Sequence, residues 1–180
     1  AGNSGPGEST VAHNSPWLTT VAATTHHNFD NTVVLGNGTK IRGASISQKT
    51  LPQTRLISSA RARADGADRE DARLCVLGGN LDRDKVKGKI VVCERGVNDR
   101  VDKSLAVKKA GGVGMILANV TPGSLDADFH SVPTVHISDT AGPKVYGYIA
   151  DKGAAATARI AVGNITADVT PLPQVAGRHQ

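Results

Sequence analysis

Carboxylate and imidazole side chains gather in one short stretch of the sequence that could bind a ligand. Asp126, Asp128, Phe129 and His130 follow each other closely, and His136 comes six residues after His130. Such groups can coordinate a cation or transfer protons near neutral pH. A polar loop followed by a strand histidine is the alternative, and it needs no ligand. We therefore predict no metal site and keep the stretch as a candidate recognition surface.

A serine between glycines near the start of the chain has the surroundings of a nucleophile at first sight. Ser4 lies in Gly2-Asn3-Ser4-Gly5-Pro6, but Pro6 breaks the Gly-x-Ser-x-Gly pattern of hydrolases. His26 and His27 are adjacent, and adjacent strand residues point to opposite faces, which disfavours joint metal binding. No Ser, His and Asp stand at a recognisable triad spacing. The chain is therefore not predicted to be a self-contained hydrolase.

Three Asn-x-Thr triplets, which begin at Asn37, Asn119 and Asn164, match the acceptor pattern for N-glycosylation. The pattern has a meaning only in a eukaryotic protein, and the composition does not decide the source. The three asparagines therefore remain candidates for modification.

The elements around these residues have clear patterns. β-branched runs flank the turn Gly36-Asn37-Gly38, which is the strongest local signal for a β-hairpin. Two continuous apolar runs, Lys89–Cys93 and Val113–Asn119, are typical of strands buried on both faces. The helical pattern between them, at about residues 100–110, predicts a strand-helix-strand unit whose strands are parallel neighbours.

The second half of the chain continues with a loop and a further strand and helix. The segment Val120–Pro133 has no periodicity, and a loop of that length in a compact domain is either functional or disordered. Thr134–Ile137 is predicted to be a strand and residues 140–151 a helix. Thr157–Val162 would then return the chain to a sheet.

Composition excludes several classes of function. A chain of 180 residues suits one domain, or one domain with parts of its neighbours. The formal charge is +5, but the basic residues are scattered among acidic ones and only five residues are aromatic, so we predict no nucleic-acid binding. No apolar run is long enough to span a membrane, and no membrane association is predicted.

The order of several motifs resembles a known domain. Leu74-Cys75 and Leu81 precede Lys85–Gly96, and Ala110–Asn119 is followed by His130 with Val132-Pro133-Thr134. This layout resembles the protease-associated (PA) domain inserted in subtilisin-like serine proteases. The resemblance implies a β-rich α/β fold of the PA type, a swivelling β/β/α domain with small parallel and antiparallel sheets and flanking helices.

The flanks resemble the catalytic domain of such a protease. Residues 1–46 are similar to the segment that carries the oxyanion-hole asparagine, which would be Asn3, and to a hairpin before the insertion. Residues 47–162 would be the PA domain, and residues 163–180 the return to the catalytic domain. In the family order the catalytic Asp and His precede Asn3 and the nucleophilic Ser follows Gln180, so this chain is expected to hydrolyse nothing alone. Its last three residues, Arg178 to Gln180, depart from the family pattern.

The resemblance also implies a role and a location. The parent protein would be secreted, and the domain would shape substrate access, recognise a protein or peptide substrate, or mediate self-association. A free-standing peptide-binding module, as in sorting receptors, is the alternative, but it would not carry these flanks. We expect the loop with Asp126, Asp128, Phe129 and His130 to form the binding surface, without a cofactor.

The two cysteines, Cys75 and Cys93, are too few for a common zinc site and do not form a Cys-x-x-Cys motif. Each ends a predicted segment, and a short turn between them lets the chain double back. Disulfides persist in the extracellular setting that the resemblance implies, so we predict a Cys75–Cys93 bond. Two buried thiols are the alternative.

Overall fold

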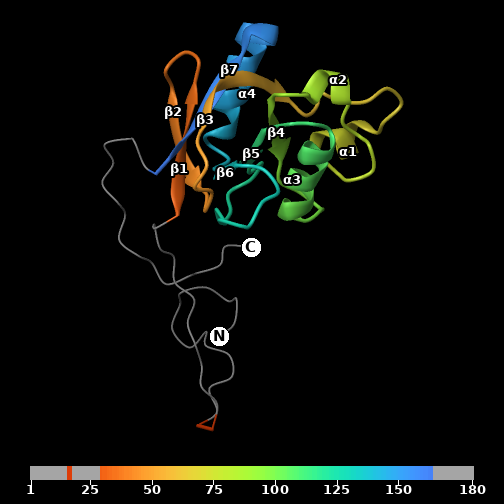
Figure 1. The fold of residues 1–180 in the computed structure, drawn as a ribbon. Helices are drawn as coiled ribbons and strands as arrows, with labels where there is room; N and C mark the ends of the chain where they lie inside the picture. Colours follow the sequence, from red (N-terminus) through yellow and green to blue (C-terminus); the bar gives the residue numbers. More distant parts are fainter. Residues whose placement is uncertain (1–15, 18–28, 164–180) are drawn as a thin grey trace. The chain divides into compact units, whose positions relative to one another are not determined.

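The computed structural model describes residues 16–17 and 29–163. Its strands form one closed barrel in the order β1-β2-β6-β5-β4-β3-β7 (Figure 1). The strands are β1 Asp30–Leu35, β2 Lys40–Ala44, β3 Leu51–Ser58, β4 Ile90–Glu94, β5 Gly114–Ala118, β6 Thr134–Ile137 and β7 Thr157–Val162. The sequence predicted separate parallel and antiparallel sheets, and this is wrong because strand pairing continues around the whole barrel.

The parallel part of the barrel consists of β3, β4, β5 and β6. Strands β4 and β5 pair directly, with Val91 opposite Met115, as the strand-helix-strand pattern predicted. Both strands are buried on two faces. Ile90 and Val92 point into the barrel core, whereas Val91 and Cys93 belong to a second cluster outside it, with Val107 of α3. Burial on both faces explains the unbroken apolar runs.

The antiparallel part consists of the β1–β2 hairpin and of β7, which pairs with β1 on one side and with β3 on the other. Its turn contains Gly38 at a φ of 87°, a conformation that glycine adopts without strain. The hairpin closes the barrel through one register pair, Ala44 with His136. Without β1 and β2 the edges of β6 and β7 would stay unpaired.

The position of the hairpin changes the domain bounds. We placed residues 1–46 in a flanking catalytic segment, but residues 30–44 supply two barrel strands, and the compact unit begins at Phe29. The assignment of residues 1–28 and 163–180 to a catalytic domain concerns residues that the structure, apart from 16–17 and 163, does not describe. That assignment remains a prediction.

Two longer helices pack against the barrel. They are α3 Arg100–Lys109 and α4 Gly142–Lys152, close to the predicted bounds. Val145, Tyr148 and Ile149 of α4 join the barrel core. The shorter helices are α1 Arg69–Arg73, α2 Arg83–Val86 and the 3-10 turn η1 Gly153–Ala155. No helix of the described residues is long and apolar enough to cross a membrane.

The predicted disulfide is present between Cys75 and Cys93, whose Cα atoms are 5.8 Å apart. Both residues are fully buried in the cluster outside the barrel. The bond joins the end of the α1 segment to β4 and closes a separation of 18 residues. The alternative of two buried thiols does not hold.

Candidate functional site

The residues that follow β4 and β5 lie at one end of the parallel strands, where side chains after the carboxyl ends gather. Arg95 comes directly after β4, and its backbone N–H donates to the carbonyl of Ala118, the last residue of β5 (2.8 Å). Residues 95–99 then lead into α3. The loop 119–133 leaves β5 at the same end. These two loops form the candidate site.

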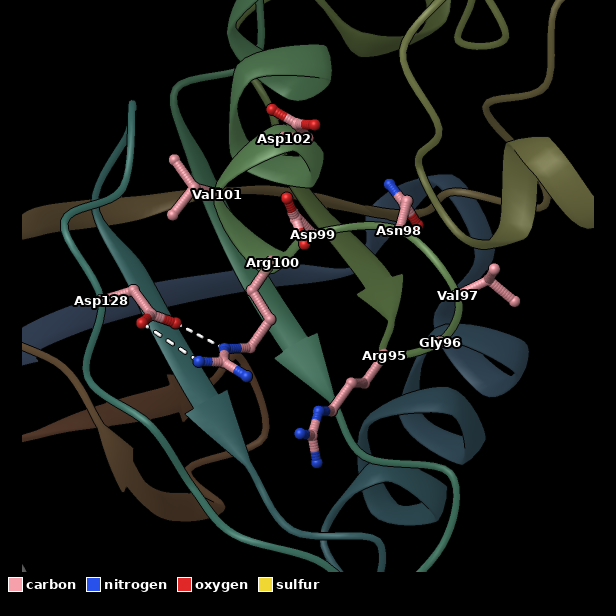
Figure 2. A pocket seen from close by; sticks show the side chains of 9 residues that line it. All are labelled: Arg95, Gly96, Val97, Asn98, Asp99, Arg100, Val101, Asp102 and Asp128. Atoms are coloured by element: carbon pink, nitrogen blue, oxygen red, sulfur yellow. Dashed lines mark hydrogen bonds and ion pairs between the residues drawn. The ribbon is translucent and has the colours of Figure 1, made fainter.

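An ion-pair network joins the two loops. Arg100, the first residue of α3, donates to Asp128 through Nε (2.5 Å) and Nη2 (3.2 Å), as Figure 2 shows. Its Nη1 lies 3.2 Å from Asp126, and Arg95 lies 3.9 Å from the same carboxylate. The hydrogen bonds from Arg100 lower the pKa of Asp128, so this carboxylate stays charged well into the acidic range.

A cleft of about 340 Å³ opens beside this network (Figure 2). It is lined by the β4–α3 loop, the first turn of α3 and Asp128. Arg95 and Arg100 extend to the same side of the loop in Figure 2. Asp99 occupies the N-cap position of α3 without bonding to the helix backbone, so its carboxylate also remains available. The cleft therefore presents both signs of charge.

Exposed apolar side chains occur on both loops of the candidate site, and two of them, Val97 and Val101, line the cleft. Val97 is 97% exposed and Phe129 is 88% exposed, and Val101 and Leu125 are exposed to a smaller extent. All four belong to the two loops or to the first turn of α3. Exposed large apolar side chains beside fixed charges are typical of a surface that binds another molecule.

The buried ring of His136 holds the second loop in place. Its Nδ1 accepts the backbone N–H of Asp126 (3.0 Å), and its Nε2–H donates to Oδ1 of Asn119 (2.7 Å). Asn119 Nδ2 in turn donates to the carbonyls of Gly123 and Ser124. Burial lowers the pKa of His136 to about 4, so the ring is neutral at pH 7. The loop is thus fixed from beneath.

A buried lysine fixes the first loop. Lys103 is fully buried in α3, and its Nζ donates to the carbonyl of Leu74 (2.6 Å) and to Oδ1 of Asn98. Burial lowers its pKa to about 8. Leu74 precedes the disulfide residue Cys75, so Lys103 connects the cleft loop to the disulfide. Each loop of the site is therefore hydrogen-bonded to a buried side chain, the first to Lys103 and the second to His136.

A family model described as "PA domain" matches residues 50–145 of this chain. The chain belongs to the PA domain family. "Subtilisin-like protease SBT5.3" of Arabidopsis thaliana is 44% identical over 155 residues, which are 83% of this chain and 20% of that protein. "Subtilisin-like protease SBT1.7" of the same plant is 39% identical over 180 residues, 98% of this chain and 23% of that protein. The chain spans about a fifth of the length of these relatives.

A solved structure confirms the fold of this PA domain. "Aminopeptidase from Aneurinibacillus sp. strain AM-1" superimposes with a TM-score of 0.53 at 21% identity, over 78% of this chain and 32% of that chain. At this level of identity the likeness shows the fold alone.

The predicted binding residues of the PA domain have different surroundings in the structure. Asp126 and Asp128 meet in the ion-pair network, and Phe129 points to solvent. His130 does not line the cleft, and both ring nitrogens are buried without a hydrogen-bond partner among the described residues. Burial lowers the pKa of His130 as well. Whether these residues bind a ligand stays a prediction.

Sequence reasoning missed the two arginines and the anchors of the PA domain loops. Arg100 lies 28 residues from its partner Asp128. A signal was present, since Arg95 and Arg100 stand where a buried strand ends and a helix begins. Asn3 lies outside the described residues. Within the described residues no group of three or more His, Cys, Asp or Glu side chains could hold a metal ion.

Proposed function

We propose that this PA domain is a non-catalytic part of a secreted subtilisin-like serine protease and that it binds protein or peptide substrates of that enzyme. The observation that carries the proposal is the match of almost the whole chain to a protease relative, with 98% covered by the alignment. The family model alone covers residues 50–145, so the similarity to the protease continues on both sides of it. The disulfide suits an oxidising compartment outside the cytosol.

The binding surface in this proposal consists of the exposed apolar side chains on the two loops and the first turn of α3, which are Val97, Val101, Leu125 and Phe129. We call it the apolar rim. Apolar side chains of a substrate would be buried against the rim, and the charges of Arg95 and Arg100 would orient polar groups. Lys103 and His136 hold the loops in place before binding, which lowers the entropy cost of ordering them when a ligand binds.

A peptide-binding assay tests the rim. Fluorescently labelled overlapping peptides of casein are titrated with the chain, and affinity is measured by anisotropy. Replacement of one exposed anchor, as in Phe129→Ser or Val97→Ser, is expected to weaken binding about 5- to 30-fold, the range of an interface anchor of 1–2 kcal/mol. The control is Val113→Ser, because Val113 is exposed but lies before β5, at the opposite end of the strands. Equal affinities for all variants would refute the rim.

The non-catalytic part of the proposal has a separate test. The purified chain is incubated with casein and with peptide anilides, and with a fluorophosphonate that labels activated serines. We expect neither hydrolysis nor labelling, because a nucleophile without its base and acid partners has little activity. Turnover that the fluorophosphonate abolishes would show that the chain is itself a peptidase.

A further inference from the structure

Two of the three Asn-x-Thr triplets lie in the described part of the chain, and the fold presents them in opposite ways. Asn37 is in the turn between β1 and β2, and Asn119 directly follows β5. Glycosylation attaches a large polar sugar to the side-chain amide nitrogen, Nδ2, and this sugar must extend from the protein surface into solvent. The surroundings of each Nδ2 therefore decide which asparagine can carry a sugar in the folded protein.

Asn37 is exposed to solvent in the turn that joins β1 to β2. Its Oδ1 accepts the backbone N–H of Thr39 (3.0 Å), which fixes the side chain next to the hydroxyl-bearing residue of the triplet. Nδ2 donates no hydrogen bond to any described residue. A Cβ added at the neighbouring Gly38 would meet nothing within 4 Å. On the Gly38 side the turn therefore has room for a bulky group, whereas a Cβ at Gly36 would meet the side chains of Tyr148 and Thr157.

Asn119 is only 3% exposed, and its whole amide is in use. Oδ1 accepts from His136, and Nδ2 donates to two carbonyls of the loop that begins there. A sugar on Nδ2 would remove one of its two hydrogens and would have to occupy the space of the loop. The hydrogen bonds by which Asn119 holds the loop and a glycan on Asn119 therefore exclude each other.

We propose that Asn37 is an N-glycosylation site of this protein and that Asn119 stays unmodified. The donor is an oligosaccharide linked to a lipid through a diphosphate. The bond between Nδ2 of Asn37 and C1 of the first sugar forms, the bond from C1 to the diphosphate oxygen breaks, and the lipid diphosphate leaves. Nδ2 loses one proton to a base of the transferase. The inference rests on the proposed secretion of the protein.

The test distinguishes a failure of Asn37 as the acceptor from a failure of the proposed secretion. The chain is expressed behind a signal peptide in a eukaryotic host, and glycopeptides are mapped by mass spectrometry before and after treatment with peptide N-glycosidase. Thr166→Ala in every variant removes the third triplet. Thr39→Ala removes the triplet of Asn37, and Thr121→Val removes that of Asn119 while the asparagine itself is kept. Translation into microsomes reports glycosylation even if secretion fails.

We expect a single glycan, located on Asn37, lost in Thr39→Ala and unchanged in Thr121→Val. An unmodified Asn37 in a disulfide-bonded chain from the secretory route, or in microsomes, would overturn the assignment. A glycan on Asn119 in a chain that unfolds at the same temperature as the unmodified protein would overturn the second half. Cytosolic location of the natural protein would refute the proposed secretion and leave the acceptor result intact.

Discussion

Protonation of His136 is expected to destabilise the PA domain as the pH falls below neutral. The ring is fully buried, and its neutral form satisfies both nitrogens, one as acceptor from Asp126 and one as donor to Asn119. A second proton would occupy Nδ1, which now accepts a hydrogen bond. Burial is the main cause of the lowered pKa; the nearby Asp126 raises it, and Arg95 and Arg100 lower it further.

The sign and the size follow from two pKa values. An unfolded histidine takes up its proton near pH 6.5, whereas the folded ring stays neutral until about pH 4. Between these values the unfolded state binds more protons, so the free energy of unfolding falls with falling pH. The contribution of His136 is complete above pH 6.5 and is lost toward pH 4. From pH 7 to pH 5 the loss is about 2 kcal/mol.

Urea unfolding at pH 7 and pH 5 measures this loss. His136→Gln keeps an acceptor and a donor but cannot titrate, so its unfolding free energy should fall by about 2 kcal/mol less than that of the natural protein. His130→Gln is measured in parallel, because burial lowers the pKa of His130 as well and its own contribution to the pH dependence has to be separated from that of His136. The same pH dependence in the natural protein and in His136→Gln, or an NMR titration of the His136 ring with a midpoint above pH 6, would show that His136 does not cause the loss of stability.

Three further predictions concern the supports of the site and the closure of the barrel. Burial lowers the pKa of Lys103 to about 8, so the unfolded state binds more protons than the folded state between pH 8 and pH 10. Over that range the natural protein should gain about 2 kcal/mol of stability relative to Lys103→Met, as measured by urea unfolding. A loss of stability over the same range would contradict the burial of the charge. Replacement of both Cys75 and Cys93 by Ala should lower the unfolding free energy by about 3 kcal/mol, and an unchanged urea midpoint would contradict this. Gly43→Ala places a Cβ against the backbone carbonyl of His136 in β6 and should destabilise the protein by about 1–3 kcal/mol. Gly147→Ala is the control, because a Cβ at that position has open space around it and should leave the stability unchanged. Equal melting temperatures for the two variants would contradict the tight closure between β2 and β6.

The parts of the fold that the sequence could predict depend on local patterns. The strands around Val91 and Met115 are apolar at every position because both of their faces are covered, and this pattern is visible in the sequence alone. Helix α3 and the β1–β2 turn have equally local signals. The disulfide was predictable because the chain offers only two cysteines.

The remaining features depend on contacts between distant residues. The barrel closes through a single register pair between β2 and β6, and no periodicity reports such a pairing. The bond from Arg100 to Asp128 forms only because β4 and β5 end side by side. Lys103 looks like a solvated helix residue in the sequence, yet it is fully buried, since two acceptors meet its amine.

The most direct test of the proposed function is an NMR titration of the isotopically labelled chain with the casein peptides that bind best. We expect chemical-shift changes confined to the apolar rim and the cleft, at Val97, Val101 and residues 125–129, with Val113 unchanged. Saturable binding that leaves these residues unchanged and shifts resonances on another face of the barrel would show that the binding surface lies elsewhere.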